Sequence, residues 1–289
     1  MMSKVAVVTD SNSGISQKEN IEGLFVIPMP FIINDKTYFE DVDLTRDDFF
    51  KYLKDGADVH TSQPFPDDIT SLWKKVLEEY DEIVHIPMSS GLSGSCETAM
   101  MLAKKFEGKV RVVDNQRISV TLYRAVLDAL SLAKKGKTAD EIGKILEDDK
   151  FNSSIYIMLD TLYYLKKGGR ITKSAAALGS LLHIKPVLQI QGEKLDAFAK
   201  VRTLSKGKEV MLKAIESDIT NRFGGCYDKD KLIFGVAHTK NHDEACELKE
   251  ELLKIYPGAT IDFQPLPLSI ACHIGPGTLG VACTKRLED

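Results

Sequence analysis

The stretch that decides the fold is Ile83-Val84-His85-Ile86-Pro87-Met88, followed directly by Ser89-Ser90-Gly91-Leu92-Ser93-Gly94-Ser95. The apolar run is typical of a buried strand, and the residues after the loop are typical of a helix. A helix that starts in this way leaves several backbone N–H groups unpaired. With the helix dipole and the hydroxyls of Ser90, Ser93 and Ser95, these groups suit a negatively charged oxygen. The alternative is a turn that only caps its own helix.

A similar pattern precedes this stretch and another follows it. Val5–Asp10 is an apolar run that ends in a polar turn, residues 11–14, as a strand buried on both faces does. A strand over 110–114 and a helix over 118–135 come after it. Strand and helix therefore alternate, which predicts a doubly wound α/β domain. A new strand near residue 154 places the boundary at about residue 150, so we expect two α/β domains, 1–150 and 151–289.

Composition excludes several classes of protein. Of 289 residues, 43% are hydrophobic and 28% are charged, which is typical of a soluble globular protein. The net charge of −4 gives no indication of a nucleic-acid partner. The N-terminus leads directly into a strand, and no apolar run reaches the about 18–20 residues of a membrane helix, so we expect a cytoplasmic protein. Five scattered cysteines without CxxC spacing argue against a disulfide framework and a zinc site.

Two further segments are candidates for ligand binding. Thr61-Ser62-Gln63-Pro64 holds two hydroxyls on a loop stiffened by proline, and such a pair can donate to a carboxylate or phosphate. Its alternative is a cap for the next helix. His273-Ile274-Gly275-Pro276-Gly277 places a histidine in a turn, and a ring that titrates near neutral pH suits an oxyanion contact. A histidine with a structural role is the alternative.

Positive charge gathers in Lys166-Lys167-Gly168-Gly169-Arg170, and Lys200 and Arg202 add to it. Such a run is usually only a solvated surface, and the glycines keep a docking or phosphate-contact role as the alternative. The helix expected over 173–182 is small and apolar on nearly every side. Buried packing is favoured there, and room for an apolar ligand tail is the alternative.

No Walker A, Rossmann, HExxH or kinase motif is present in the sequence. Residues 91–95 partly match the GxSxG nucleophile elbow of serine hydrolases, with serine in place of the last glycine. Ser93, a downstream acid and His273 would follow the chain order of a hydrolase triad. A serine hydrolase that acts on a lipid or ester is therefore the alternative to a binding protein.

Six motifs in a fixed order cover nearly the whole chain: Val8-Thr9-Asp10-Ser11, Thr61-Ser62-Gln63-Pro64, Ser89-Ser90-Gly91-Leu92-Ser93-Gly94-Ser95, Leu165-Lys166-Lys167-Gly168-Gly169-Arg170-Ile171, Ile184-Lys185-Pro186-Val187-Leu188 and His273-Ile274-Gly275-Pro276-Gly277. In this respect the chain resembles the DegV family, whose members include the fatty-acid-binding subunits (FakB) of bacterial fatty acid kinase. The resemblance implies two α/β domains with a long-chain fatty acid held between them, its carboxylate at the interface and its tail buried.

Carried over by motif, the resemblance also implies a role for individual residues. Thr61 and Ser93 would hydrogen-bond the carboxylate. Ser62 and Gly94 would supply backbone N–H groups, and His273 would complete the polar end. The family's usual Thr-Asp-Ser-x-Ser-Asp start has glycine at residue 14 in place of its acid here, which weakens the case for a ligand contact by that turn.

In the family a separate ATP-dependent kinase phosphorylates the bound carboxylate to an acyl phosphate. The resemblance therefore implies a carrier without catalytic residues, metal or cofactor, whose ligand is the fatty acid itself. Arg170 and Arg202 would contact the kinase or the new phosphate. A carrier for another acidic amphiphile stays open, because chain length and saturation of the ligand do not follow from the sequence.

Overall fold

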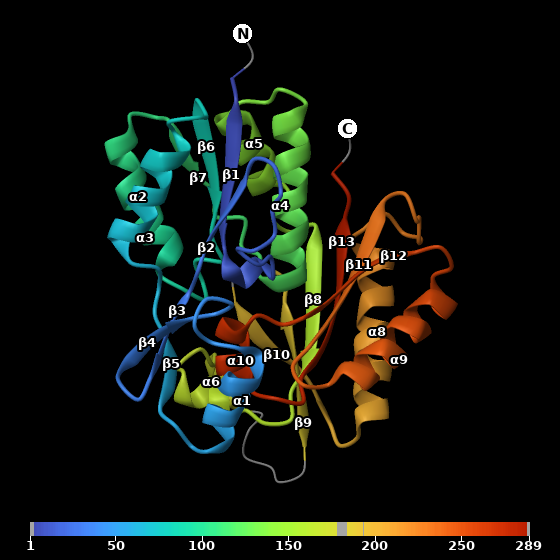
Figure 1. Cartoon of the computed structure of the whole chain (residues 1–289). Helices are drawn as coiled ribbons and strands as arrows, with labels where there is room; N and C mark the ends of the chain where they lie inside the picture. Colours follow the sequence, from blue (N-terminus) through green and yellow to red (C-terminus); the bar gives the residue numbers. More distant parts are fainter. Residues whose placement is uncertain (1–2, 178–183, 193, 288–289) are drawn as a thin grey trace. The chain divides into compact units, whose positions relative to one another are not determined.

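The computed structural model describes residues 3–177, 184–192 and 194–287 (Figure 1). The chain forms two compact units, and each is described by itself. The first unit consists of Met1–Ile118, Leu122–Lys150 and Pro267–Ser269. The second unit consists of Ser119–Thr121, Phe151–Leu266 and Ile270–Asp289. Both combine sheets with helices, and the mixed α/β class expected from the alternation of strands and helices is confirmed.

A four-stranded parallel sheet forms the centre of the first unit. Its order is β2 (Leu24–Ile27), β1 (Val5–Asp10), β6 (Glu82–Ile86) and β7 (Val110–Val112). Every residue of β1 is buried, as the continuous apolar run predicts. β2, the next strand along the chain, lies on one side of β1, and β6 lies on the other. The order of the strands therefore reverses direction at β1. Open α/β sheets bind ligands at the carboxyl ends of strands at such a point.

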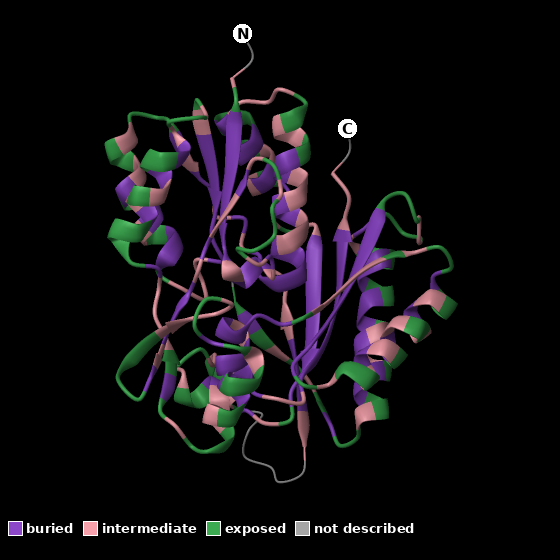
Figure 2. Ribbon diagram, in the orientation of Figure 1, coloured by how far each residue is buried: buried purple, intermediate pink, exposed green. Residues whose placement is uncertain are grey.

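Helices cover both faces of this sheet (Figure 1). On one face lie α2 (Pro66–Val76) and α3 (Ser95–Ala103), and on the other lie α4 (Ser119–Lys134) and α5 (Ala139–Asp148). The faces that the helices turn towards the sheet are buried (Figure 2). Trp73 of α2 is fully buried, with its ring 5.4 Å from that of His85 on β6. This apolar core fixes the strand ends from which the candidate loops emerge.

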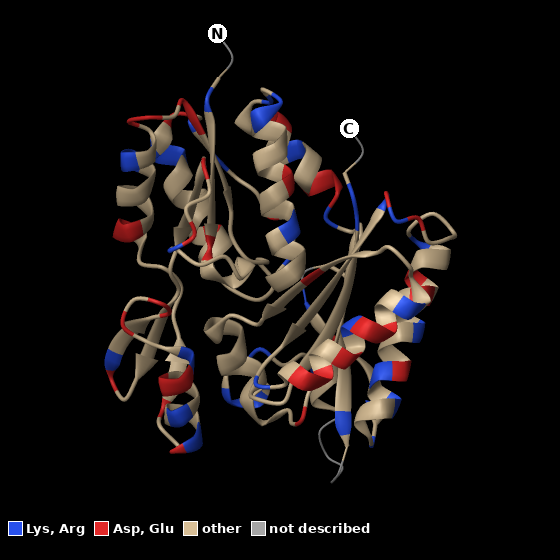
Figure 3. Ribbon diagram, turned by 45° about the vertical axis from the view of Figure 1, so that its right-hand side comes forward, with Lys and Arg blue, Asp and Glu red and all other residues tan. Residues whose placement is uncertain are grey.

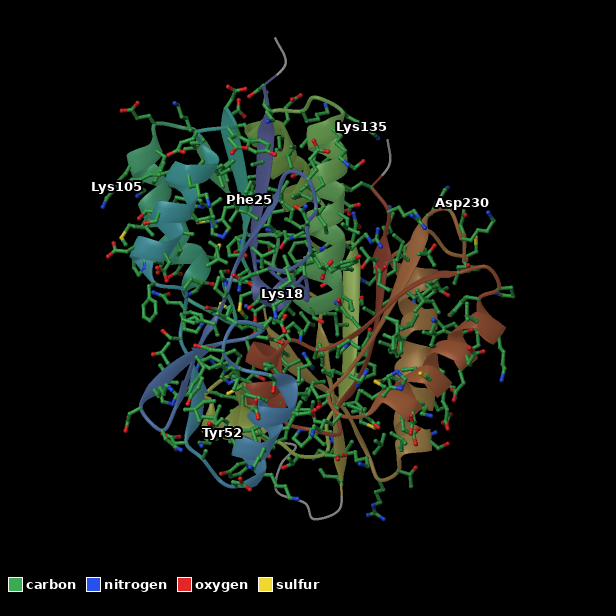
Figure 4. All side chains as sticks on the ribbon, viewed as in Figure 1. Lys18, Phe25, Tyr52, Lys105, Lys135 and Asp230 are labelled. Carbon is green, nitrogen blue, oxygen red and sulfur yellow. The ribbon has the colours of Figure 1, made fainter. Side chains whose placement is uncertain are left out.

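A small antiparallel sheet also belongs to the first unit. It consists of β4 (Lys36–Phe39), β3 (Pro30–Ile33) and β5 (Val59–Thr61), with α1 (Arg46–Lys54) beside it. Thr45 caps α1 by accepting a hydrogen bond from Asp48 N. Figure 4 labels Tyr52 of α1. Its ring lies 6.1 Å from that of Tyr38 on β4. The prediction that Thr61 lies in a loop is wrong, because β5 pairs with β3 as far as Thr61.

The second unit has a six-stranded mixed sheet. Its order is β10 (Leu195–Val201), β9 (Lys185–Ile190), β8 (Ser153–Met158), β13 (Leu279–Lys285), β11 (Leu232–His238) and β12 (Thr260–Pro265). Only the β11–β12 pair is parallel among these described strands. Two long helices, α8 (Leu204–Asn221) and α9 (His242–Ile255), pack on one face of the sheet and form the core of this unit with it.

Charges of both signs are interspersed on α8 and α9 (Figure 3). Glu209 pairs with Lys206 and Lys213 along α8, at 2.8 Å each, and Lys208 joins α8 to Glu244 and Glu247 of α9, at 2.7 Å each. A surface of alternating sign is typical of a solvated helix face. In the part of the chain that the structure describes, no helix is both long and apolar enough to cross a lipid bilayer.

Three short helices complete the second unit: α6 (Tyr163–Lys167), α7 (Lys173–Ala176) and α10 (Leu268–Ile274), of which α10 begins in the first unit. The helix expected over 173–182 is described only as α7, and its residues 178–183 lie outside the described residues. Helix α10 was not predicted. The placement of His273 in an irregular turn is therefore wrong, because the residue lies in the last turn of a helix.

Candidate functional site

The Ser/Gly loop between β6 and α3 is held on two sides by carboxylates. Asp10, at the end of β1, accepts a hydrogen bond from Met88 N at 2.9 Å. Asp114, just after β7, accepts from Ser90 N at 3.2 Å and from the Ser90 hydroxyl at 2.5 Å. Both acids lie at the carboxyl ends of parallel strands, so the sheet itself places them beside the loop. The backbone at residues 88–90 is thus fixed by side chains from the two neighbouring strands.

Asp10 is also the centre of a buried polar chain. Its other oxygen accepts from the backbone N–H of Asn12 at 2.9 Å and from the Asn12 amide at 2.7 Å, and Asn12 accepts from the Ser269 hydroxyl at 2.6 Å. Burial raises the pKa of Asp10, and these hydrogen bonds oppose that rise. The polar groups of Asp10 and Asn12 are therefore used in hydrogen bonds within the protein, which agrees with the weak case for ligand binding by this turn.

Of the three hydroxyls expected to bind an anion, Ser93 is placed best. The Ser90 hydroxyl donates to Asp114, which argues against its donation to a ligand. The Ser95 hydroxyl is buried and has no hydrogen-bond partner among the described residues, so its expected role stays a prediction. The Ser93 hydroxyl is half-buried and accepts from Ser95 N at 3.2 Å, which leaves its own proton free to donate. Gly94 is exposed, and no described residue accepts a hydrogen bond from its N–H. These two neighbours offer a hydroxyl and a backbone donor at the start of α3.

The Thr61–Ser62 loop lies beside the start of α3. Thr98, on the first turns of α3, donates to Gln63 Oε1 at 3.1 Å. A Cβ atom built on Gly94 would lie 3.5 Å from the same oxygen. The structure thus brings the two hydroxyl-bearing segments of the first unit together, although 30 residues of chain separate them.

One expected donor in this loop is already used. Ser62 N donates to the carbonyl of Pro30 at 3.0 Å, which extends the β3–β5 ladder by one bond. A backbone N–H has one hydrogen to donate, and here it already donates to Pro30 O. The backbone role expected of Ser62 is therefore not supported. Its half-buried hydroxyl is the group that Ser62 can offer.

His273 lies in the second unit, packed against Gly168 of the basic motif. A Cβ atom on Gly168 would lie 2.3 Å from His273 Nδ1, so only glycine fits there without a shift. Burial, and then the positive charge of Arg170, lower the pKa of His273 to about 4. The expectation that the ring titrates near neutral pH is therefore wrong. At neutral pH the imidazole is uncharged and can give one hydrogen bond, but no ionic attraction, to an anion.

The turn after His273 depends on glycine at two positions with positive φ. Gly275 has φ +76° and lies against the ring of Tyr164, while Gly277 has φ +81° and lies against Asp160. Thr239, after β11, donates its hydroxyl to Gly275 O at 2.6 Å and accepts Thr278 N at 3.2 Å. The Gly-Pro-Gly turn and the α6 segment, far apart in sequence, are therefore packed as one structure.

The two candidate arginines are both exposed in the second unit. Arg170 donates to Gly168 O at 2.5 Å, and Arg202 directly follows β10. Neither forms an ion pair with a carboxylate of the described chain. Unpaired, exposed guanidinium groups are suited to bind a phosphate or an acidic partner, but nothing in the geometry identifies one.

Sequence reasoning assigned no role to three residues that build these segments: Asp114, Thr98 and Thr239. Asp114 could have been found, because an acid directly after a buried strand sits at the ligand-binding edge of a parallel sheet. Thr98 and Thr239 carry no such signal, since their partners are far away in sequence. Among the described residues, no group of three or more His, Cys, Asp or Glu could hold a metal ion.

Known proteins match this chain over almost its full length. Residues 4–286 match the family model described as "Uncharacterised protein, DegV family". A DegV domain-containing protein from Streptomyces coelicolor is 31% identical, with 99% of this chain and all of that protein covered.

Two solved structures are similar in fold. A DegV family protein from Thermus thermophilus, reported for its fatty acid binding, has a TM-score of 0.88 at 29% identity and covers 98% of this chain. DegV from Bacillus subtilis, reported as a fatty acid binding protein, has a TM-score of 0.85 at 27% identity and covers 98% of this chain. All of each of these chains is covered. The match of the family model over nearly all residues is decisive, and this chain belongs to the DegV family.

Proposed function

We propose that this protein binds a long-chain fatty acid and presents it to an ATP-dependent kinase for acyl-phosphate formation. The observation that carries the proposal is the junction of two donor-bearing segments, Thr61–Ser62 and Ser93–Gly94, through Gln63 and Thr98. The relatives from T. thermophilus and B. subtilis, which are reported to bind fatty acids, support the choice of ligand. His273 is proposed as a further, uncharged donor.

The chemistry of the donors fits a carboxylate. A carboxylate that leaves water must regain several hydrogen bonds, and hydrogen bonds to an ionised group are the stronger kind. Two hydroxyls and the Gly94 N–H supply them in the first unit without a positive side chain. The acyl tail would supply most of the affinity, at about 0.8 kcal/mol for each buried methylene.

We propose no catalytic residue, metal or cofactor for this chain, and a location in the cytoplasm. The Ser93 hydroxyl accepts the Ser95 N–H in the manner of a helix cap, and nothing in the comparisons favours a serine hydrolase. Phosphoryl transfer would therefore belong to the kinase. Arg170 and Arg202 are proposed to contact that kinase or the new phosphate, because both are exposed and lack a described carboxylate partner.

The first test is native mass spectrometry of the purified protein, followed by extraction of any bound lipid. We expect one fatty acid per chain. Ser93→Ala and Thr61→Ala should each weaken retention by about 1–3 kcal/mol, because each removes a partner of a buried charged group. Ser205→Ala, at an exposed position of α8, is the matched control and should bind as the unmodified protein does. An apo protein that takes up neither oleate nor palmitate would rule the proposal out.

The same preparations test presentation to the kinase. With a fatty acid kinase and ATP, Arg170→Ala and Arg202→Ala should form less acyl phosphate while they retain their lipid. Lys144→Ala, another exposed cation, should match the unmodified protein. Full acyl-phosphate formation by both arginine variants would remove these residues from the proposal and leave the lipid-binding part intact.

A further inference from the structure

The Gln63 side chain links the Thr61–Ser62 loop to the first turns of α3. It follows Ser62 in the chain, and its Oε1 accepts the Thr98 hydroxyl at 3.1 Å. The same oxygen lies 3.5 Å from the position of a Cβ atom on Gly94. Pro64, which is buried, follows Gln63 and restricts its backbone to extended conformations. The position of the amide is therefore fixed from both ends.

The nitrogen of this amide has no partner. Oε1 and Nε2 are bonded to the same planar carbon, so holding the oxygen also limits where the nitrogen can lie, and the oxygen is the only Gln63 atom within 4 Å of the Cβ position on Gly94. No described residue accepts a hydrogen bond from Gln63 Nε2, and none accepts from Gly94 N. Gln63 Nε2 and Gly94 N thus both remain as donors near the start of α3.

We propose that Gln63 is a specificity residue of the head-group site, whose amide nitrogen donates to the ligand's carboxylate while Thr98 holds the amide oxygen. The inference rests on the proposed function, because it requires an anionic head at the start of α3. An amide in this role selects for an acceptor-only group. A carboxylate offers two oxygens and no proton, whereas an alcohol of the same chain length offers one hydroxyl.

The decisive variant is Gln63→Glu. Glutamate has nearly the same shape and can still accept from Thr98, but it replaces the donor by a negative charge next to the ligand's carboxylate. The measurement is the dissociation constant of the delipidated protein for palmitate and for hexadecanol, by displacement of a fluorescent fatty acid. Palmitate should bind about tenfold more weakly or worse, while hexadecanol should change by less than about twofold.

Two further variants separate charge from structure. Gln17→Glu adds the same charge at an exposed position of the first unit and should leave both constants unchanged. Thr98→Val removes the hydroxyl that holds Oε1 and should weaken palmitate binding by only a few-fold, because Nε2 is still present. It should also reduce the preference for palmitate over hexadecanol.

The outcomes are distinct. Selective loss of palmitate binding in Gln63→Glu establishes the role. Equal loss of both ligands would show that Gln63 only supports the loop, and unchanged palmitate binding would show that it faces no carboxylate; either result overturns the inference and leaves the proposed function standing. If the unmodified protein binds neither ligand, the proposed function fails and the inference fails with it.

Discussion

The Ser/Gly loop of the first unit and the Gly-Pro-Gly turn of the second use glycine in opposite ways. At Gly94 the only atom near the position of a Cβ atom is Gln63 Oε1, at ordinary contact distance, and no described residue accepts a hydrogen bond from the N–H. At Gly275 the ring of Tyr164 occupies the space that a side chain would need, 2.3 Å from where a Cβ atom would lie. Glycine in the loop gives access, and glycine in the turn gives packing. Substitutions should therefore affect ligand binding in the first case and stability in the second.

The largest effect is expected at Gly275. Gly275→Ala introduces a methyl group into the Tyr164 ring at a φ of +76°, so overpacking adds to backbone strain. We expect a loss of about 4 kcal/mol in the free energy of unfolding, measured by urea denaturation followed by circular dichroism.

Gly169→Ala is the matched control. Gly169 also has a positive φ, +68°, but nothing lies within 4 Å of its Cβ position, so this variant should lose only about 1 kcal/mol. Equal losses in the two variants would mean that backbone strain alone accounts for the loss at Gly275. Packing against Tyr164 would then not be the reason for glycine at this position.

The next effect concerns the loop and its support at Asp10. Asp10→Ala leaves Met88 N and both nitrogens of Asn12 without their acceptor in a buried place, and we expect a loss of about 3 kcal/mol in stability. Asp114→Ala, at a half-buried position where water can replace the carboxylate, should lose less, about 1 kcal/mol.

The two variants also test whether stability and binding are separable in the loop. Asp114→Ala frees Ser90 N and its hydroxyl but leaves Ser93 and Gly94 in place, so palmitate binding should persist. A greater loss of stability for Asp114→Ala than for Asp10→Ala would contradict the ranking by burial.

The regular elements follow from the sequence wherever a local pattern determines them. β1 was predicted with its observed bounds because a continuous apolar run ends in a polar turn. β5 was missed because it has three residues and depends on pairing with β3. Helix α10 was missed because it has only seven residues, after a segment with two prolines.

The candidate site was predicted by residue type and less well by role. A hydroxyl in a Ser/Gly loop is visible in the sequence, but its partner is not. Asp114 accepts a hydrogen bond from Ser90, which is 24 residues away in sequence. The carbonyl of Pro30 accepts from Ser62 N as part of the β3–β5 pairing. The neutral state of His273 is equally non-local, since it results from burial and from the charge of Arg170. Such roles are set by tertiary packing, on which a single sequence carries little local signal.

The smallest expected effect tests that neutral state by pH. His273 has a pKa of about 4 in the fold against 6.5 ordinarily, so on acidification the unfolded chain binds a proton before the folded chain does. The stability contributed by the neutral ring is present above pH 6.5 and is lost as the pH falls towards 4. Between pH 7 and pH 5 the loss should be about 2 kcal/mol.

His85 changes stability in the same direction and Glu40 in the opposite one, because burial lowers the pKa of His85 to about 3 and raises that of Glu40 to about 7. The quantity to measure is therefore the difference in unfolding free energy between the unmodified protein and His273→Gln at each pH, in which the other groups cancel. Between pH 7 and pH 5 the unmodified protein should lose about 2 kcal/mol more unfolding free energy than His273→Gln does. A difference that does not depend on pH would mean that the pKa of the ring is the same in the folded and the unfolded chain, so that burial does not hold the ring neutral.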